Sequence, residues 1–126
     1  MTNGRRNELS VVTRRHPRGF IIVPFIVPAF LPFKLELVLN TGRPVSYVSE
    51  GSLRMLQAFG VVTEVGRRHY RLTGLRLGDY DSPPLNVRVS IGPRLMGVEG
   101  FLGLDFLALF RTIRFERDSG LLALDA

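Results

Sequence analysis

The sequence predicts an all-β domain with one or two short helices, and three observations support this fold class. The 126 residues suffice for one compact domain with a buried core, and 45% hydrophobic against 22% charged residues is an ordinary globular balance. Short apolar or alternating runs recur between glycine, proline and aspartate turns, as they do in β-rich chains. No internal repeat and no linker follows residue 20, so we expect a single domain over residues 20–126.

The first apolar run covers residues 20–33 and contains Pro24, Pro28 and Pro32. Proline lacks an amide hydrogen and breaks a helix interior, so we expect extended chain here, with the prolines at strand ends or on a sheet edge. The run is shorter than the roughly 20 residues of a spanning helix and lacks the cleavage site of a secretory signal. We therefore expect no membrane span and, because cysteine is also absent, a cytoplasmic protein.

The middle of the chain predicts two strands followed by a helix. Residues 34–39 alternate and then become fully apolar, which is typical of a strand entering a core, and residues 45–48 form a second, shorter strand. Ser49 is placed to cap a helix over residues 50–59, which Gly60 ends. Apolar residues recur inside this helix at helical spacing, namely Leu53, Leu56 and Phe59.

The second half predicts two hairpins and one cleanly alternating strand. Residues 61–65 and 67–72 flank Gly66 and form a hairpin with Gly66 at its tip. Residues 85–91 alternate, so their odd-numbered side chains face the core, and Asp105 caps a short helix. The remaining elements are a strand at residues 75–77, a loop at 79–84, a tight apolar segment at 100–103, the capped helix at 106–110, and a closing hairpin of residues 113–116 and 121–124.

The positive charge is concentrated at the N-terminus. The formal net charge is +6, and residues 1–19 hold five arginines against one glutamate. We therefore expect a basic, flexible arm over residues 1–19, which can contact nucleic acid or an acidic partner. The arm has no Phe, Tyr or Trp to stack on a base, so a solvated terminus is favoured over nucleic-acid binding.

The chain has no cysteine, and its two histidines, His16 and His69, lie far apart in the sequence. A disulfide scaffold, a thiol nucleophile, an iron–sulfur cluster and a thiolate zinc site are excluded. A histidine-based metal site or a serine–histidine triad would depend on one of these two residues alone. We expect no metal and no cofactor.

Three segments, taken in order, resemble the retropepsin-like aspartic peptidases. The first is residues 37–42, where apolar residues lead into Asn40-Thr41-Gly42 and Ser46 follows in the next strand. The family has Asp-Thr/Ser-Gly at this place. The resemblance implies a retropepsin-like barrel, closed or partly open, with a flap hairpin over a peptide-sized cleft.

The second and third segments complete the resemblance. Residues 98–107 resemble the apolar-apolar-Gly element of the family and the helix after it, and residues 115–124 resemble its closing hairpin. The hairpin around Gly66 sits where the family places its flap, and His69 lies on the same flap strand. The substrate-binding residues that the resemblance implies are Gly66, Tyr70, Phe101, Leu102 and Gly103.

The resemblance also implies a mechanism and an assembly. This peptidase chemistry needs two carboxylates about 3 Å apart that share one proton, one acting as general base on water and the other as general acid. The chain has one such loop, so the family pattern implies a homodimer with one loop from each subunit and an extended peptide or protein substrate. Thr41 would tie the two loops together through its hydroxyl, and Gly42 would allow the close backbone turn.

Position 40 departs from the family because it is asparagine where the catalytic aspartate stands. An amide is not a base at any useful pH and shares no proton with its mate. General acid–base catalysis contributes roughly 10²–10⁴-fold, so we predict no meaningful peptidase activity from this sequence. Arg43 also departs from the small residue usual there and is placed to crowd or charge the site. A natural pseudo-peptidase and an engineered inactive variant both remain open.

Four other aspartates could in principle replace the missing acid, namely Asp79, Asp81, Asp105 and Asp118. Asp118 begins Asp-Ser-Gly but follows an arginine rather than an apolar strand, and it falls in a hairpin turn. Asp105 is read as a helix cap, and Asp79 and Asp81 as loop carboxylates beside prolines. None replaces an acid at position 40.

Two alternative functions stay open at this point. One is a β-rich module that binds peptide or nucleic acid through the arginine-rich arm, whose phosphate binding would fall steeply with added salt. The other is a heterodimer with an active relative that supplies one carboxylate. One aspartate facing one asparagine leaves a single titrating group, so we expect little activity from such a pair.

Overall fold

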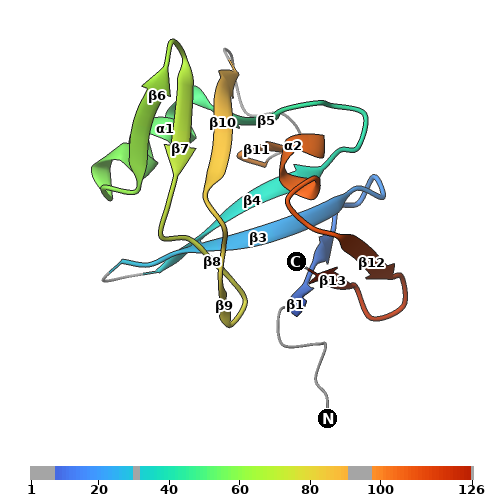
Figure 1. Cartoon of the computed structure of the whole chain (residues 1–126). Coiled ribbons are helices and arrows are strands. Elements are labelled where there is room, and N and C mark those ends of the chain that lie inside the picture. The colour runs from blue at the N-terminus through green and yellow to red at the C-terminus, as the bar shows by residue number, and fades with distance from the viewer. Residues whose placement is uncertain (1–7, 30–31, 91–97, 126) are drawn as a thin grey trace.

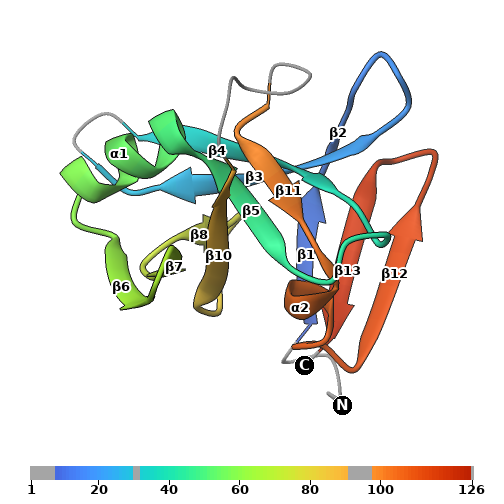
Figure 2. The same cartoon turned by 90° about the horizontal axis from the view of Figure 1, so that it is seen from above.

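The computed structural model describes residues 8–29, 32–90 and 98–125 and arranges them in two sheets (Figures 1 and 2). The larger sheet has the strand order β6-β7-β10-β5-β11-β4-β3-β8-β9, with β2 paired to β3, and the smaller has the order β1-β13-β12. The predicted all-β class is confirmed, and the hydrogen-bonded order of the larger sheet ends at β6 and β9 without closing. The elements are β1 (Glu8–Val12), β2 (Arg14–Arg15), β3 (Ile21–Val27), β4 (Phe33–Leu39), β5 (Ser46–Ser49), α1 (Glu50–Ala58), β6 (Val62–Gly66), β7 (His69–Leu72), β8 (Arg76–Leu77), β9 (Tyr80–Asp81), β10 (Leu85–Ser90), β11 (Gly100–Leu102), α2 (Leu104–Leu107), β12 (Thr112–Glu116) and β13 (Leu121–Asp125).

The three prolines of the first apolar run lie where the sheet tolerates them. Pro28 follows β3 and Pro32 precedes β4, so both stand at strand ends. Pro24 lies inside β3, where β2 pairs only as far as Ile22 and β8 begins at Phe25. Position 24 therefore falls in a gap between these two neighbours, which is a local sheet edge.

Helix α1 forms where the sequence predicts it. The Ser49 backbone is extended, and its Oγ accepts a hydrogen bond from the Ser52 amide at 3.2 Å, which satisfies a free donor of the first turn. The helix buries Leu53 and Leu56 against the main core. It ends at Ala58, and the predicted last residue, Phe59, forms its C-cap instead.

The hairpin of β6 and β7 has its tip one residue later than predicted. Gly66 pairs with His69, so Arg67 and Arg68 form the turn and the expectation of Gly66 at the tip is wrong. The pairing shifts register between Glu64 and Gly66, and this irregularity in β6 moves the turn along the chain.

The centre of the larger sheet brings two distant segments together. β11 pairs in parallel with β4 and antiparallel with β5, and Leu102 stands opposite Leu39. The chain therefore leaves β4 at Asn40 and leaves β11 at Gly103 side by side. Neighbouring β10 buries Leu85 and Val87, as its predicted alternation requires, whereas Val89 is half-buried and position 91 lies outside the described residues.

The N-terminal segment differs from the predicted flexible arm over residues 8–15. β1 pairs antiparallel with β13, and β2 pairs antiparallel with β3. Val11 is only 2% exposed, so the apolar alternation of Leu9 and Val11 outweighs the surrounding charge. Residues 1–7 of the predicted arm lie outside the described residues.

The C-terminal hairpin forms as predicted from residues 113–116 and 121–124, with β12 and β13 each one residue longer at one end. β13 lies between β1 and β12, so both ends of the described chain meet in the smaller sheet (Figure 2). Within the described ranges, neither α1 nor α2 has the length and apolar character that crossing a membrane requires.

Candidate functional site

Asn40 closes a tight turn at the end of β4. Its amide N–H donates to the carbonyl of Leu102 at 2.9 Å, which fastens the turn to the end of β11. Its side-chain Oδ1 accepts a hydrogen bond from the N–H of Gly42 at 3.0 Å, as in an Asx turn. A Cβ at position 42 would lie 3.2 Å from that oxygen, so glycine suits the turn. A carboxylate oxygen accepts the same hydrogen bond, so the turn accommodates aspartate as well as asparagine at position 40.

The loop after Asn40 is seated on the segment that follows β11. The amides of Leu104 and Asp105 donate to the carbonyls of Arg43 and Pro44 at 2.9 and 3.1 Å. A Cβ at Gly103 would lie 2.6 Å from the Val45 carbonyl oxygen, so only glycine permits this approach. The predicted apolar-apolar-Gly element therefore lies directly against the Asn40 loop.

Asp105 belongs to this junction. The prediction that it caps the short helix is wrong. The N-cap of α2 is Gly103, and Asp105 lies in the first turn. Its carboxylate accepts hydrogen bonds from the Ser46 amide at 3.0 Å and the Ser46 hydroxyl at 2.8 Å. The same hydroxyl accepts from the Gly103 amide at 2.9 Å, so fully buried Ser46 joins both segments. The capping interpretation failed because Ser46 is distant in sequence.

Arg43 lies against two aromatic rings. Its guanidinium carbon is 4.6 Å from the centre of the Phe101 ring and 5.6 Å from that of Tyr47, within range of cation–π attraction. Phe101 packs in a small cluster with Ile22, whereas its neighbour Leu102 belongs to the main core. The two side chains therefore point to opposite faces of β11, and Arg43 covers the face away from the main core.

Thr41 and Gly42 are exposed, while Asn40 is half-buried. The Thr41 hydroxyl makes no hydrogen bond with any residue of the described ranges. The tip of this turn is therefore open to a partner, and the turn itself is held from beneath by the Gly103 segment.

A pocket of about 210 Å³ lies between this junction and the β7–β10 pair. One wall comes from the end of the Asn40 loop, the start of β5 and α2, and the other from β7 and β10. Its lining residues are Val45, Ser46, Asp105, His69, Asn86, Val87 and Arg88. His69 and Tyr70 are the β7 residues that the resemblance places on a flap, and of these two His69 lines this pocket together with Val45 of the Asn40 loop.

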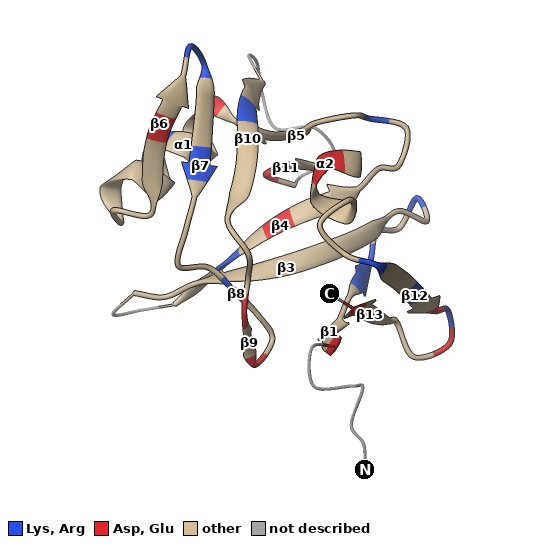
Figure 3. Cartoon of the chain, in the orientation of Figure 1, with Lys and Arg blue, Asp and Glu red and all other residues tan. Residues whose placement is uncertain are grey.

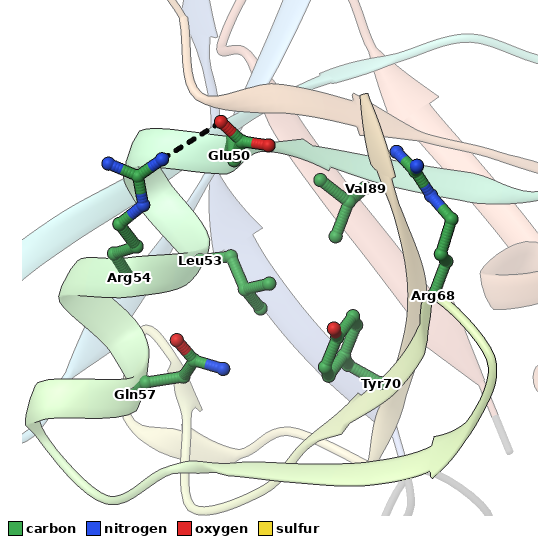
Figure 4. Close-up of a pocket in the computed structure, with 7 residues that line it drawn as sticks. All are labelled: Glu50, Leu53, Arg54, Gln57, Arg68, Tyr70 and Val89. Carbon is green, nitrogen blue, oxygen red and sulfur yellow. Dashed lines mark hydrogen bonds and ion pairs between the residues drawn. The ribbon is translucent and has the colours of Figure 1, made fainter. Parts of the chain in front are cut away.

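Tyr70 faces a different pocket, between the hairpin and α1 (Figure 4). Successive residues of a strand point to opposite faces, which separates Tyr70 from His69. Gly66 is exposed on the hairpin, and Leu102 is fully buried in the main core. The predicted substrate-binding residues are therefore spread over several surfaces. Leu102 and Gly103 belong to the junction, because the Leu102 carbonyl accepts from the Asn40 amide and Gly103 lies against the loop that follows Asn40.

The remaining aspartates have local surroundings that account for them. Asp118 lies in the turn between β12 and β13, and Asp81 forms an ion pair with Arg76 at 2.8 Å. Arg76 also donates to the carbonyl of Asp79. Among the described residues, no group of three histidine, cysteine, aspartate or glutamate side chains could hold a metal ion.

The N-terminal arginines are divided between the fold and the surface. Arg14 donates two hydrogen bonds of 2.9 Å to Glu36 on β4, across β3. This hydrogen bond raises the pKa of Arg14 above its ordinary value, and the charge of Glu36 and of Glu99 adds to the effect. Arg15 and Arg18 are exposed, whereas Arg5 and Arg6 lie outside the described residues. The charge of Arg14 is therefore paired within the fold, which leaves it less available to bind a polyanion.

No protein-family model matches the sequence, and no curated protein shows significant similarity to it. The fold is similar to the crystal structure of a retropepsin-like aspartic protease from Rickettsia conorii, with a TM-score of 0.60. The alignment covers 93% of this chain and 88% of that chain at 17% sequence identity. At this identity the similarity shows a shared fold, and it agrees with the fold that the three sequence segments implied.

Proposed function

We propose that this chain is a retropepsin-like domain that forms a homodimer, binds an extended peptide, and does not cleave it. The observation that carries the proposal is Asn40. It lies at the end of β4, in a turn that accepts an acid equally well, within a fold similar to that of an aspartic protease.

The absence of cleavage follows from the chemistry of the amide. Two carboxylates brought close together share a proton, so that one activates water and the other protonates the leaving amine. Two Asn40 side chains supply neither an ionisable base nor an acid. The half-buried acid of the junction, Asp105, is already bound to Ser46 through both of its oxygens.

Two features support assembly through the Asn40 loop. Thr41 is exposed and its hydroxyl has no partner in the described chain, so it is available to a second copy. Exposed apolar side chains also lie on the segment from α2 to β12, which follows the Gly103 element beneath this loop, with Leu104 46%, Leu109 52% and Ile113 41% exposed. A second copy that covers this segment would remove these side chains from water, which favours association.

The pocket beside His69 supports peptide binding near the same loop. It combines the apolar Val45 and Val87 with the polar Asn86 and Arg88. An extended peptide bound here would use main-chain hydrogen bonds for affinity and this pocket for a side chain.

The test is the single substitution Asn40→Asp. The carboxylate can accept the Gly42 hydrogen bond, so we expect the fold and the dimer to be retained and peptide cleavage to appear at acidic pH. Because the two carboxylates are coupled, activity should depend on two apparent pKa values that belong to the pair. A library of quenched fluorescent peptides, assayed from about pH 3 to 7, measures this gain.

Asn40→Ala is the matched control, since it removes the amide without adding an acid and should remain inactive. A dimeric Asn40→Asp protein that cleaves no member of a diverse library would contradict the peptidase origin of the site. Cleavage by the unsubstituted chain, abolished in Asn40→Ala, would contradict the proposed loss of activity.

A further inference from the structure

A second pocket of about 320 Å³ lies between α1 and the β6–β7 hairpin, apart from the Asn40 junction (Figure 4). Figure 4 shows the side chains of α1 on one side and those of the hairpin on the other, with Val89 of β10 between them. The lining residues are Glu50, Leu53, Arg54, Gln57, Arg68, Tyr70 and Val89.

The charged groups of this pocket leave one cation available. Arg54 is paired with Glu50 at 2.9 Å, one turn away on α1. Arg68 forms no hydrogen bond or ion pair with any residue that the structure describes. The lining therefore carries one uncompensated positive charge, at the hairpin turn that appears blue in Figure 3.

Arg68 occupies a backbone conformation that its residue type disfavours. Its φ is +56°, and it is the only non-glycine residue with positive φ in the described part of the chain. Glycine or asparagine adopts this conformation at lower cost, so an arginine here is locally unfavourable. Backbone strain of this kind concentrates at functional sites, where another role of the side chain offsets it.

The rest of the lining defines the shape of a ligand. Leu53 and Val89 provide an apolar floor, and the Tyr70 hydroxyl and Gln57 amide add uncharged hydrogen-bonding groups without partners in the described chain. Glu50 stands at the same pocket, which disfavours a doubly charged group such as phosphate. The lining therefore matches a single carboxylate on a short apolar stem.

We propose that this pocket binds the side chain of a glutamate in a peptide, with Arg68 pairing the carboxylate and Leu53 and Val89 packing against its methylenes. The proposal concerns a site separate from the Asn40 junction and does not depend on cleavage or dimerisation. A glutamate bound here would link α1 to the hairpin turn, and so restrain the hairpin.

The experiment is a ¹⁵N–¹H NMR titration of the full chain with acetyl-Ala-Glu-Ala-amide and with its glutamine counterpart. We expect shifts at Arg68, Tyr70 and α1, with about fivefold tighter binding of the glutamate peptide that weakens as salt is added. Arg68→Asn removes the cation while favouring positive φ, so the variant folds, and it should reduce affinity for the glutamate peptide about fivefold.

Arg67→Asn is the matched control, because Arg67 is the other residue of the same turn and lines no part of this pocket. Its affinity should stay within about twofold of the parent chain. Equal binding of the two peptides, equal losses in the two variants, or no shift with millimolar glutamate peptide would each overturn the proposal.

Discussion

At position 40 the turn and the catalytic chemistry of an aspartic peptidase require different properties of the side chain. The turn requires an oxygen that accepts the Gly42 hydrogen bond, and the amide of Asn40 provides it. Catalysis requires a group that ionises, which the amide does not do. The turn therefore accommodates either an amide or a carboxylate at this position, and Asn40→Asp isolates that one chemical difference.

Gly103 is the residue at which the junction tolerates least change. For Gly103→Ala, the added methyl would meet the Val45 carbonyl at 2.6 Å, so the two backbone segments must separate. We expect a loss of about 2–4 kcal/mol in the free energy of unfolding, measured by urea denaturation.

Gly51→Ala is its matched control within α1. No atom lies within 4 Å of a Cβ built at Gly51, and alanine favours a helix. This variant should be stabilised by about 0.5–1 kcal/mol. A Gly103→Ala protein as stable as the parent chain would show that the junction is not tightly packed.

At the scale of elements, local sequence patterns correctly predicted those features that local interactions stabilise. The Ser49 cap and the burial of Leu85 and Val87 at alternate positions of β10 are short-range features, and both were confirmed. The Asp105 interaction with Ser46 and the pairing of β1 with β13 join distant segments, and sequence spacing gave no signal for either partner. The irregular register of β6 likewise displaced the hairpin turn from Gly66.

The same limit applies to the candidate site. The Asn40 loop and the Gly103 segment were identified through the family resemblance, and that resemblance already implied that the two segments lie together. Arg68 was missed as a functional candidate because a positive φ at an arginine leaves no mark in the sequence. Its pocket needs α1 and β10 beside the hairpin, which only the folded chain provides.

The hairpin turn gives different predictions for the change in stability when each of its two arginines is replaced by glycine. Arg68→Gly should stabilise the chain by about 0.5–1 kcal/mol, because glycine adopts a φ of +56° without strain. Arg67→Gly should be neutral or destabilising by a similar amount, since position 67 does not have positive φ and glycine only adds unfolded-state entropy. Thermal unfolding of the two variants measures the difference, and a lower Tm for Arg68→Gly would argue against strain at the turn.

At the scale of the whole molecule, the two ends of the described chain form strands of the smaller sheet and help to hold the fold together. β1 forms one edge of the smaller sheet and contributes Val11 to the main core. Deletion of residues 1–18 would therefore remove β1 and β2 together with the arginines. A loss of binding in such a truncation reports on the fold as much as on charge, so arginine-to-glutamine changes at exposed Arg15 and Arg18 are the cleaner test of the basic segment.

The proposed dimer gives the last prediction. Ile113 is 41% exposed on β12, which is the second edge of the smaller sheet in the described chain. The strand therefore presents unpaired backbone groups along its outer side, beside an apolar side chain open to a second copy. Ile113→Glu places a charge in that contact, and in a two-fold assembly each subunit carries it. We expect at least a tenfold weaker dimer, about 1.4 kcal/mol, by sedimentation velocity over a range of protein concentrations.

Met55→Glu is the control, because Met55 is 48% exposed on α1, at the opposite end of the molecule from β12 in both views (Figures 1 and 2). A parent chain that stays monomeric at every concentration, or equal dissociation of both variants, would contradict assembly through this face.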